Sequence, residues 1–194
     1  MLKLAMDIKL VESNCLQLSG KKETVLINPS NDLLKKTNSR IVVYNKQIEP
    51  GLLTANNKVL IVGPGEYEVG GVEIIGLGDG NGGVIYSIII DGVTLAVLAN
   101  IKTELTEKKI DKLGSADVLV ADVGQNDTAQ NKALFKLAKG MGVNYLVPIG
   151  AISSEPHLID FLNVTDNEGL ESVASLKIDK DNLPEGLEVV LLHE

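Results

Sequence analysis

The sequence predicts an α/β protein in which two sheets pack face to face and helices lie on the outside. Three observations lead to that class. The first half of the chain consists of short apolar runs separated by turn residues, which is typical of hairpins. From residue 100 onward, segments of helical periodicity alternate with apolar runs. The run at residues 117 to 123 is so continuously apolar that both of its faces should be covered.

The elements of the first half are short strands and one short helix. Residues 3 to 18 form two strands with a break around residues 12 to 14, and a hairpin turn at residues 20 to 23 follows. Asp91-Gly92 is a strong hairpin signal between two apolar runs. The other elements expected here are strands at residues 24 to 27, 40 to 44, 59 to 62, 84 to 90 and 93 to 98, with a helix at residues 31 to 36.

The helices of the second half have recognisable ends. Gly114 closes the first, Asp127 or Thr128 caps the second, and Gly140 and Gly142 stop it. The elements expected after residue 100 are helices at residues 103 to 113, 128 to 141, 154 to 162 and 168 to 176, with strands at residues 117 to 123, 143 to 149 and 187 to 193.

Length and composition predict one domain over residues 1–194. The chain has 194 residues, which is enough to bury a sizeable core without disulfides or metal. Hydrophobic residues make up 44% and aromatic residues only 3%, so the core is expected to consist of Val, Ile, Leu and Ala. The apolar content is also compatible with self-association into a homo-oligomer.

Charge and cysteine usage narrow the class of partner. The net charge of -8 opposes attraction to nucleic acids and to anionic membranes, so we expect neither as a partner. No apolar run approaches the roughly 20 residues of a membrane span. A single cysteine, Cys15, excludes an internal disulfide and favours a cytoplasmic location. The expected partner is a small molecule or another protein.

The stretch from residue 62 to residue 76 contains a tight turn followed by extended runs. Pro64 fixes one backbone dihedral, and the glycines on either side allow conformations that a side chain forbids. Side chains alternate along a strand, so Glu66 and Glu68 should share a face. The stretch is therefore either a carboxylate site or a structural β-corner.

Several motifs follow one another along the chain: Asn28-Pro29 after a strand, GPGEYE at residues 63 to 68, Leu98-Ala99-Asn100, and the apolar segments 117 to 124 and 147 to 150. In this order they resemble the metallo-β-lactamase superfamily, and more closely its small bacterial branch described as Zn-dependent hydrolases of the β-lactamase fold, of which GPGEYE is typical. That family has Asp-Pro at Asn28-Pro29 and Leu-Gly-Asp at residues 98 to 100. It has a DVLLxPVG strand at residues 117 to 124 and I-P-M-H at residues 147 to 150. The resemblance implies an αββα four-layer sandwich.

The resemblance also implies a dinuclear zinc site that activates water, built on an H-x-H-x-D-H signature with a later His and a bridging Asp. In this chain every imidazole of that set is replaced, and neutral amides, Pro and Gly coordinate zinc poorly or not at all. The substituted positions form the vestigial cleft: Asn45, Gln47, Glu49, Pro50, Asn100 and Gly150.

The favoured hypothesis is a pseudoenzyme-like, non-catalytic binding or structural module that holds no zinc. Its amides should satisfy one another by hydrogen bonds, and Glu66 and Asp122 are the candidate ligand-binding residues. The alternative is a metal-dependent hydrolase of a phosphoester, lactone or amide, with an oxygen-ligand site at Glu49 and Asp122.

Other candidate groups have ordinary structural interpretations beside their functional ones. His157 and His193 lack partners at metal-ligand spacing, and Cys15 is either a nucleophile or a small core residue. The loop at residues 79 to 83 lacks the Lys and Ser/Thr of a phosphate-binding loop. Four carboxylates could hold a hard cation such as magnesium or calcium, namely Glu66, Glu68, Glu73 and Asp79. They do not form the dense acidic loop that is typical of such sites.

Overall fold

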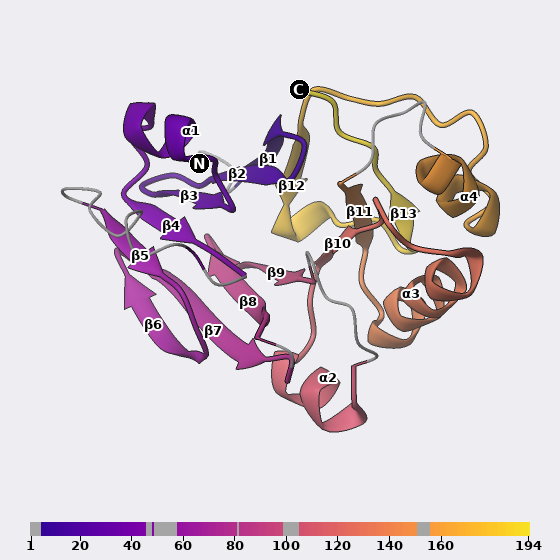
Figure 1. Ribbon diagram of the computed structural model, residues 1–194, viewed down its shortest axis with the longest axis horizontal. Coiled ribbons are helices and arrows are strands. Elements are labelled where there is room, and N and C mark those ends of the chain that lie inside the picture. The colour runs from indigo at the N-terminus through magenta and orange to yellow at the C-terminus, as the bar shows by residue number, and fades with distance from the viewer. Residues whose placement is uncertain (1–4, 46–47, 49–57, 81, 99–104, 151–155) are drawn as a thin grey trace.

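Two mixed β-sheets pack against each other, and helices cover their outer faces (Figure 1). The computed structural model describes residues 5–45, 48, 58–80, 82–98, 105–150 and 156–194. Apolar side chains from both sheets form the core cluster between them, which includes Met6, Ile27, Tyr86, Val120 and Ile178. The predicted fold class, an αββα sandwich, is therefore the fold that the chain adopts.

The first sheet has six strands in the described residues and combines both kinds of pairing. The strands from β12 to β3 pair antiparallel, whereas β3, β4 and β5 run parallel. In spatial order the strands are β12 (Leu176–Asp179), β1 (Ala5–Glu12), β2 (Cys15–Ser19), β3 (Thr24–Ile27), β4 (Ile41–Val43) and β5 (Val59–Ile61).

The second sheet has seven strands in the same part of the chain. Its hairpin-rich side, β6 to β9, is antiparallel, and β9, β10, β11 and β13 are parallel. In spatial order the strands are β13 (Glu188–Val189), β11 (Tyr145–Ile149), β10 (Val118–Asp122), β9 (Val93–Val97), β8 (Val84–Ile90), β7 (Val72–Gly78) and β6 (Gly65–Val69).

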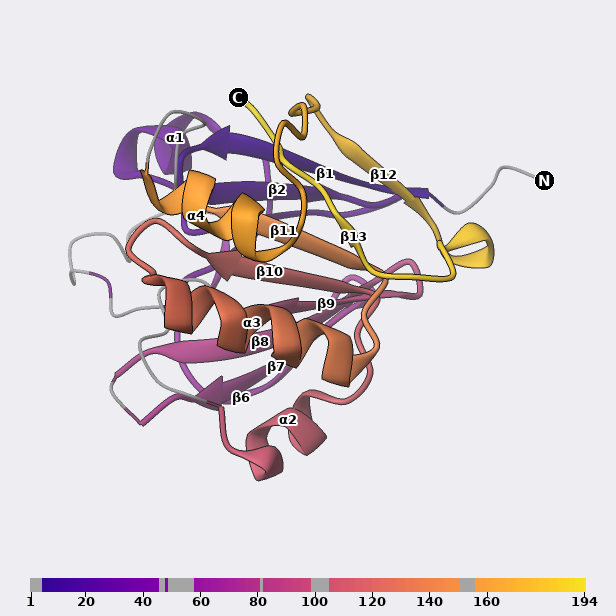
Figure 2. The same cartoon turned by 90° about the vertical axis from the view of Figure 1, so that its right-hand side faces the viewer.

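The helices form the two outer layers, and the layers are unequal. The short α1 (Asn31–Lys36) lies outside the first sheet over a small apolar cluster. Figure 2 shows α3 (Thr128–Met141) and α4 (Pro156–Val164) across the outer face of the second sheet, with α2 (Glu107–Leu113) beyond its edge. Within the described residues, no helix combines the length and apolar character that crossing a membrane requires.

Local sequence explains the ends of α3. The Asp127 carboxylate accepts from the backbone N–H of Gln130 at 2.8 Å, and the Gln130 side chain accepts from the Asp127 N–H at 2.8 Å. This capping box satisfies two of the N–H groups that a helix start leaves without partners. At the other end Gly142 adopts a φ of 67°, a left-handed conformation that glycine adopts without strain. The predicted start at Asp127 and the predicted stop at Gly142 are confirmed, whereas Gly140 lies inside the helix.

The predicted helix at residues 168 to 176 is wrong. The chain there contains a turn, with Gly169 at a φ of 77°, and continues into β12. Strand β12 pairs with β1, placing buried Ile178 opposite Met6. Its alternation of apolar and charged residues is a strand signal that the weak helical pattern obscured. The predicted terminal strand is also shorter than expected, since only β13 is regular within residues 187 to 193.

One ion pair ties the segment after β12 to the second sheet. The Lys180 ammonium lies 2.6 Å from both carboxylate oxygens of Asp117, and one of them also accepts from the Thr94 N–H at 2.9 Å. Replacing Lys180 with Met should lower the free energy of unfolding by about 1 kcal/mol, because the Asp117 carboxylate is mostly buried. Urea denaturation measures this loss.

The neighbouring exposed Lys177 provides the control for that change. It lies on β12, and the described residues contain no ion pair to it. Lys177→Met should change stability by less than about 0.5 kcal/mol. Equal losses for the two variants would show that the ion pair contributes nothing specific.

Candidate functional site

The candidate site lies at one edge of the sandwich, where parallel strands of both sheets end. Asn28 and Asn45 follow β3 and β4 of the first sheet, whereas Asp122 and Gly150 end β10 and follow β11 of the second. The Gly150 N–H donates to the Ser13 carbonyl, in the turn between β1 and β2, at 3.1 Å. That turn lies at the Asn28 end of the first sheet, because Leu16 pairs with Ile27. The two groups of strand ends therefore meet at the same edge.

Asn45, which the sequence analysis places at the first ligand position of the family's signature, is held by backbone hydrogen bonds. Its side chain is 1% exposed. Its backbone N–H donates to Asn28 Oδ1 at 3.1 Å, and its carbonyl accepts from the Val84 N–H at 2.8 Å. Asn28 has a φ of 54°, which an Asn tolerates better than most residues. Asn45 is thereby fixed by groups from both sheets.

A buried tyrosine that the sequence reasoning missed forms the wall beside Asn45. The Tyr86 hydroxyl accepts from the Gly63 N–H at 3.0 Å and donates to the Tyr44 carbonyl at 3.1 Å. It thus joins β8 to the end of β4 and to the GPG turn. Burial raises the pKa of Tyr86 to about 12, so its hydroxyl stays protonated at neutral pH. The sequence signal that could have identified Tyr86 is a single tyrosine within an apolar strand. A buried Tyr hydroxyl usually has a hydrogen-bond partner, so such a residue often connects neighbouring segments.

At Gly150 the space that a side chain would need is already filled. A Cβ atom there would overlap Asp122 Oδ1, and it would lie 2.7 Å from Asp122 Cγ and 2.9 Å from Asn14 Oδ1. Gly150 also has a φ of 83°, in the left-handed region. The carboxylate itself is held in place, because Asp122 Oδ1 accepts from the Gly124 N–H at 2.9 Å. A histidine at this position therefore does not fit the present structure.

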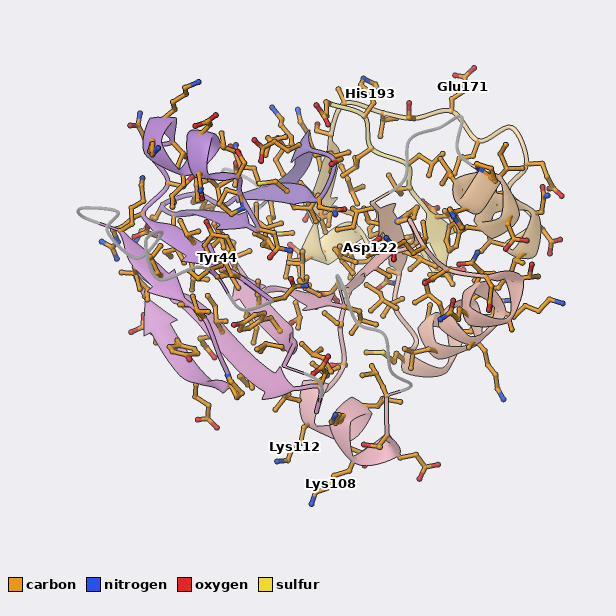
Figure 3. The ribbon with its side chains drawn as sticks, in the orientation of Figure 1. Tyr44, Lys108, Lys112, Asp122, Glu171 and His193 are labelled. Carbon is orange, nitrogen blue, oxygen red and sulfur yellow. The ribbon has the colours of Figure 1, made fainter. Side chains whose placement is uncertain are left out.

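The oxygen atoms around Gly150 can accept hydrogen bonds from a ligand. Asn14 Oδ1 is buried and has no hydrogen-bond partner within the described ranges. Asn14 Oδ1 and the half-buried Asp122 carboxylate both lie within 3 Å of the position that a Cβ atom at Gly150 would take. Two acceptors around one point favour a hydrogen-bond donor such as an N–H group. Figure 3 labels Asp122 near the middle of the view, where β10 ends.

The remaining predicted site residues do not all belong to the described structure. Gln47, Glu49, Pro50 and Asn100 lie outside the described residues, so their mutual hydrogen bonding stays a prediction. Glu66 is exposed on edge strand β6, and its binding role also stays a prediction.

The corner that carries Glu66 is fixed by its neighbours. The Glu68 carboxylate accepts from the Gly71 N–H at 2.8 Å, and the Tyr67 hydroxyl donates to the Gly63 carbonyl at 3.2 Å. Tyr67 and Val69 pack against the core cluster between the sheets. The stretch is thus a β-corner in which Glu68 has a structural role.

The two histidines and the cysteine occupy ordinary structural positions. His157 Nδ1 lies 3.0 Å from the Asn126 carbonyl oxygen, and His193 Nδ1 lies 3.1 Å from Ser172 Oγ. Cys15 is 1% exposed, and burial raises its pKa to about 12, so the thiolate nucleophile is not available at neutral pH. No cluster of three or more His, Cys, Asp or Glu suited to a metal ion occurs within the ranges that the structure describes.

A mostly apolar pocket of about 230 Å³ lies next to the Gly150 end of β11. Its link to the site is direct, because Ser13 and Ile149 line it and both belong to the backbone connections around Gly150. The pocket is lined by Leu10, Ser13, Val123, Pro148, Ile149, Leu158, Ser172, Leu191, Leu192, His193 and Glu194.

The fold and the position of the candidate site place this chain in a class of proteins: α/β sandwiches in which the site lies where strands of both sheets end. The family model for the beta-lactamase superfamily domain matches residues 7–150. The chain belongs to this superfamily. A search of curated proteins finds no match for this chain.

Solved structures share the fold at low sequence identity. A Thermotoga maritima protein assigned to the Zn-dependent hydrolases of the metallo-beta-lactamase superfamily is 21% identical, with a TM-score of 0.74 over 96% of this chain and 98% of that one. The metallo-beta-lactamase fold protein YhfI from Bacillus subtilis is 10% identical, with a TM-score of 0.60 over 97% of each chain. Zn²⁺-bound PqqB from Methylobacterium extorquens is 14% identical, with a TM-score of 0.57 over 85% and 86%.

The residues of this chain do not fit the zinc centre that the family signature implies. Zinc sites are built from Cys, His and carboxylate ligands, whereas Asn45 offers a neutral amide and Gly150 offers no side chain. The Asp122 carboxylate fills the volume that a ligand at position 150 would need. The two described ligand positions therefore argue against a dinuclear zinc site.

Proposed function

We propose that this protein is a non-catalytic binding domain that uses the edge of the sandwich around Asp122 and Gly150. The observation that supports this proposal is the Asp122 carboxylate in the space of a side chain at position 150. In the family's chemistry, metal-bound water is the nucleophile, and the metal needs several converging ligands. At position 150 the chain has a glycine in place of a histidine ligand, and the Asp122 carboxylate also leaves no room for an imidazole there.

The chemistry around Gly150 also indicates the kind of ligand. Asp122 and Asn14 present hydrogen-bond acceptors, and the neighbouring pocket is mostly apolar. Its volume of about 230 Å³ is smaller than the roughly 300–1,000 Å³ of pockets for drug-sized ligands. We infer a small molecule, or the side chain of a partner protein, that combines a small apolar group with an N–H donor.

Metal analysis tests the proposal directly. Protein purified without a histidine tag should contain fewer than about 0.1 zinc or manganese ions per chain, because an incomplete ligand set binds weakly. Its melting temperature should shift by less than about 1 °C when zinc, manganese or EDTA is added, because a ligand that does not bind the native state cannot stabilise it. Elemental analysis and thermal unfolding measure these two quantities.

A stoichiometric metal ion, or a melting temperature that falls with EDTA, would overturn the metal-free proposal. That result would favour the hydrolase alternative, with oxygen ligands at Glu49 and Asp122 and a phosphoester, lactone or amide substrate. Substituting Asp122 with Asn would then lower the metal content, because an amide is a weaker ligand than a carboxylate.

A further inference from the structure

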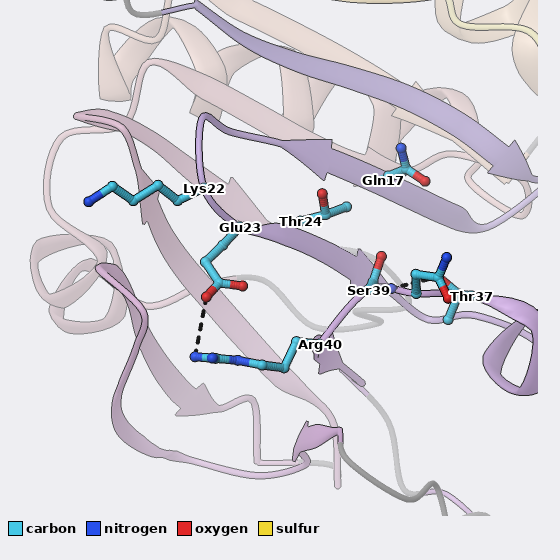
Figure 4. Close-up of a pocket in the computed structure, with 8 residues that line it drawn as sticks. Gln17, Lys22, Glu23, Thr24, Thr37, Ser39 and Arg40 are labelled. Atoms are coloured by element: carbon cyan, nitrogen blue, oxygen red, sulfur yellow. Dashed lines mark hydrogen bonds and ion pairs between the residues drawn. The ribbon is translucent and has the colours of Figure 1, made fainter.

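A second pocket lies at the other end of the first sheet, away from the candidate cleft. It has a volume of about 330 Å³ and lies at the start of β3 and β4, whereas Asn28 and Asn45 follow the ends of the same strands. Figure 4 shows its lining, in which every side chain is polar or charged. The lining residues are Gln17, Lys22, Glu23, Thr24, Thr37, Asn38, Ser39 and Arg40.

The central feature of this pocket is a buried serine. Ser39 is only 7% exposed, and its hydroxyl has no hydrogen-bond partner among the residues that the structure describes. In Figure 4 the hydroxyl points from the loop before β4 toward the strand that carries Thr24. Because Ser39 lines the pocket and its hydroxyl is not among the fully buried polar atoms, the hydroxyl is accessible from the pocket. A ligand in the pocket can replace water as its hydrogen-bond partner.

The loop that carries Ser39 is held rigidly. The Lys58 ammonium donates to the Thr37 carbonyl at 2.6 Å and to the Ser39 carbonyl at 3.1 Å. The Ser39 N–H donates to Thr37 Oγ1 at 3.1 Å, and the Arg40 carbonyl accepts from the Val59 N–H at 2.8 Å. The pocket is therefore preorganised, which lowers the entropic cost of binding.

The rim of the pocket is locally positive although the whole chain carries a charge of -8. Arg40 pairs with Glu23 at 3.2 Å, which neutralises that carboxylate. Lys22 is exposed, and no ion pair to it occurs within the described residues. One positive charge thus remains in the lining of the pocket that Thr24, Ser39 and Asn38 also line. Lysine and arginine are the usual partners of phosphate groups.

We propose that this pocket binds a small phosphorylated polyol, of the size of a monosaccharide phosphate. Lys22 and Arg40 face the phosphate, and the Ser39, Thr24 and Asn38 side chains bind the hydroxyl groups. A volume of about 330 Å³ lies at the lower end of the roughly 300–1,000 Å³ range of ligand pockets, which suits a ligand of that size. The absence of aromatic side chains from the lining favours hydrogen bonding over stacking.

Isothermal titration tests this site with three probes: inorganic phosphate, glucose 6-phosphate and glucose. Glucose 6-phosphate should bind with a dissociation constant below about 1 mM, and the other two probes should bind at least about tenfold more weakly, because each makes only part of the contacts. Binding should weaken as salt is added, since the phosphate contacts are partly exposed.

Two variants and one matched control locate the binding. Ser39→Ala and Lys22→Gln should each weaken glucose 6-phosphate binding about tenfold or more, through a lost hydrogen bond and a lost charge respectively. Lys21→Gln removes the adjacent exposed lysine, which does not line the pocket, and should leave binding unchanged within about twofold. A melting curve for each variant checks that it is folded.

Three results would overturn the proposal. The first is no binding of glucose 6-phosphate at 10 mM to the folded native protein. The second is an equal loss of affinity in Lys21→Gln and Lys22→Gln, which would indicate nonspecific attraction of an anion. The third is unchanged affinity in a folded Ser39→Ala variant, which would show that the ligand does not enter the pocket.

Discussion

Replacing Gly150 with histidine, the residue that the resemblance to the family implies at this position, is expected to lower the free energy of unfolding by about 3 kcal/mol. Two costs add. Gly150 has a φ of 83°, and a left-handed conformation costs a residue with a side chain about 1–2 kcal/mol. The new Cβ atom would also displace the Asp122 carboxylate, which the Gly124 N–H holds in place. Urea denaturation at neutral pH measures the loss.

Alanine variants separate the two costs. Gly92 has a φ of 82°, and a Cβ atom there would meet no heavy atom within 4 Å. Gly92→Ala should therefore cost only the backbone strain, about 1 kcal/mol, whereas Gly150→Ala should cost clearly more. Removing the carboxylate with Asp122→Ala should recover part of the loss in the Gly150→His background, because the new side chain then has room.

The same variants bear on the proposed binding function. Adding zinc to Gly150→His should not restore its stability, because one imidazole beside neutral amides does not complete a zinc site. Equal stability of Gly150→His and the native protein would show that Asp122 moves away at little cost. That outcome would contradict the central observation behind the metal-free site.

The free energy of unfolding is expected to fall by about 4 kcal/mol between pH 8 and pH 11. Burial, together with the nearby Glu12 charge, raises the pKa of Cys15 from 9.0 to about 12. Burial raises the pKa of Tyr86 from 10.0 to about 12. Both groups ionise more readily in the unfolded chain, so the unfolded state binds fewer protons across this range. Stability is therefore complete below pH 9 and is lost as the pH rises towards 12.

Substitutions of Cys15 and Tyr86 separate the contributions of the two residues to the loss of stability at alkaline pH. Cys15→Ala should reduce the difference in stability between pH 8 and pH 11 by about 3 kcal/mol, and Tyr86→Phe should reduce it by about 1 kcal/mol. The comparison uses differences between two pH values, because each variant also loses packing or a hydrogen bond at every pH. Urea denaturation across the pH series measures the dependence. A native protein whose stability is flat from pH 8 to pH 11 would contradict this account.

The superfamily and the order of most elements could be predicted from local signals. Asp91-Gly92 indicated the turn between β8 and β9, and Asp127 indicated the start of α3, because a turn or a cap depends on a few adjacent residues. The segment after residue 165 was predicted wrongly because its strand, β12, depends on pairing with β1 at the far end of the chain. Local propensity contains no information about such a partner.

The site could be predicted only as a set of positions. The motif register predicts that Asn45 and Gly150 are replaced ligand positions, and this stays a prediction. Tyr86 and Asn14 had no place in the motif, yet they complete the walls around those positions. Their contribution arises from contacts between segments far apart in sequence, such as the Gly150 hydrogen bond to Ser13.

The sequence by itself determined the superfamily and the two-sheet class of fold, because motifs and periodicity are properties of adjacent residues. The replacement of every histidine in the metal signature stays a prediction from the motif register. Only the tertiary structure decided what replaced the missing side chain at Gly150. A glycine leaves a space, and which neighbour fills that space depends on how β10, β11 and the turn at Ser13 pack together. Here the Asp122 carboxylate fills it, so packing as well as composition closes the position to a histidine.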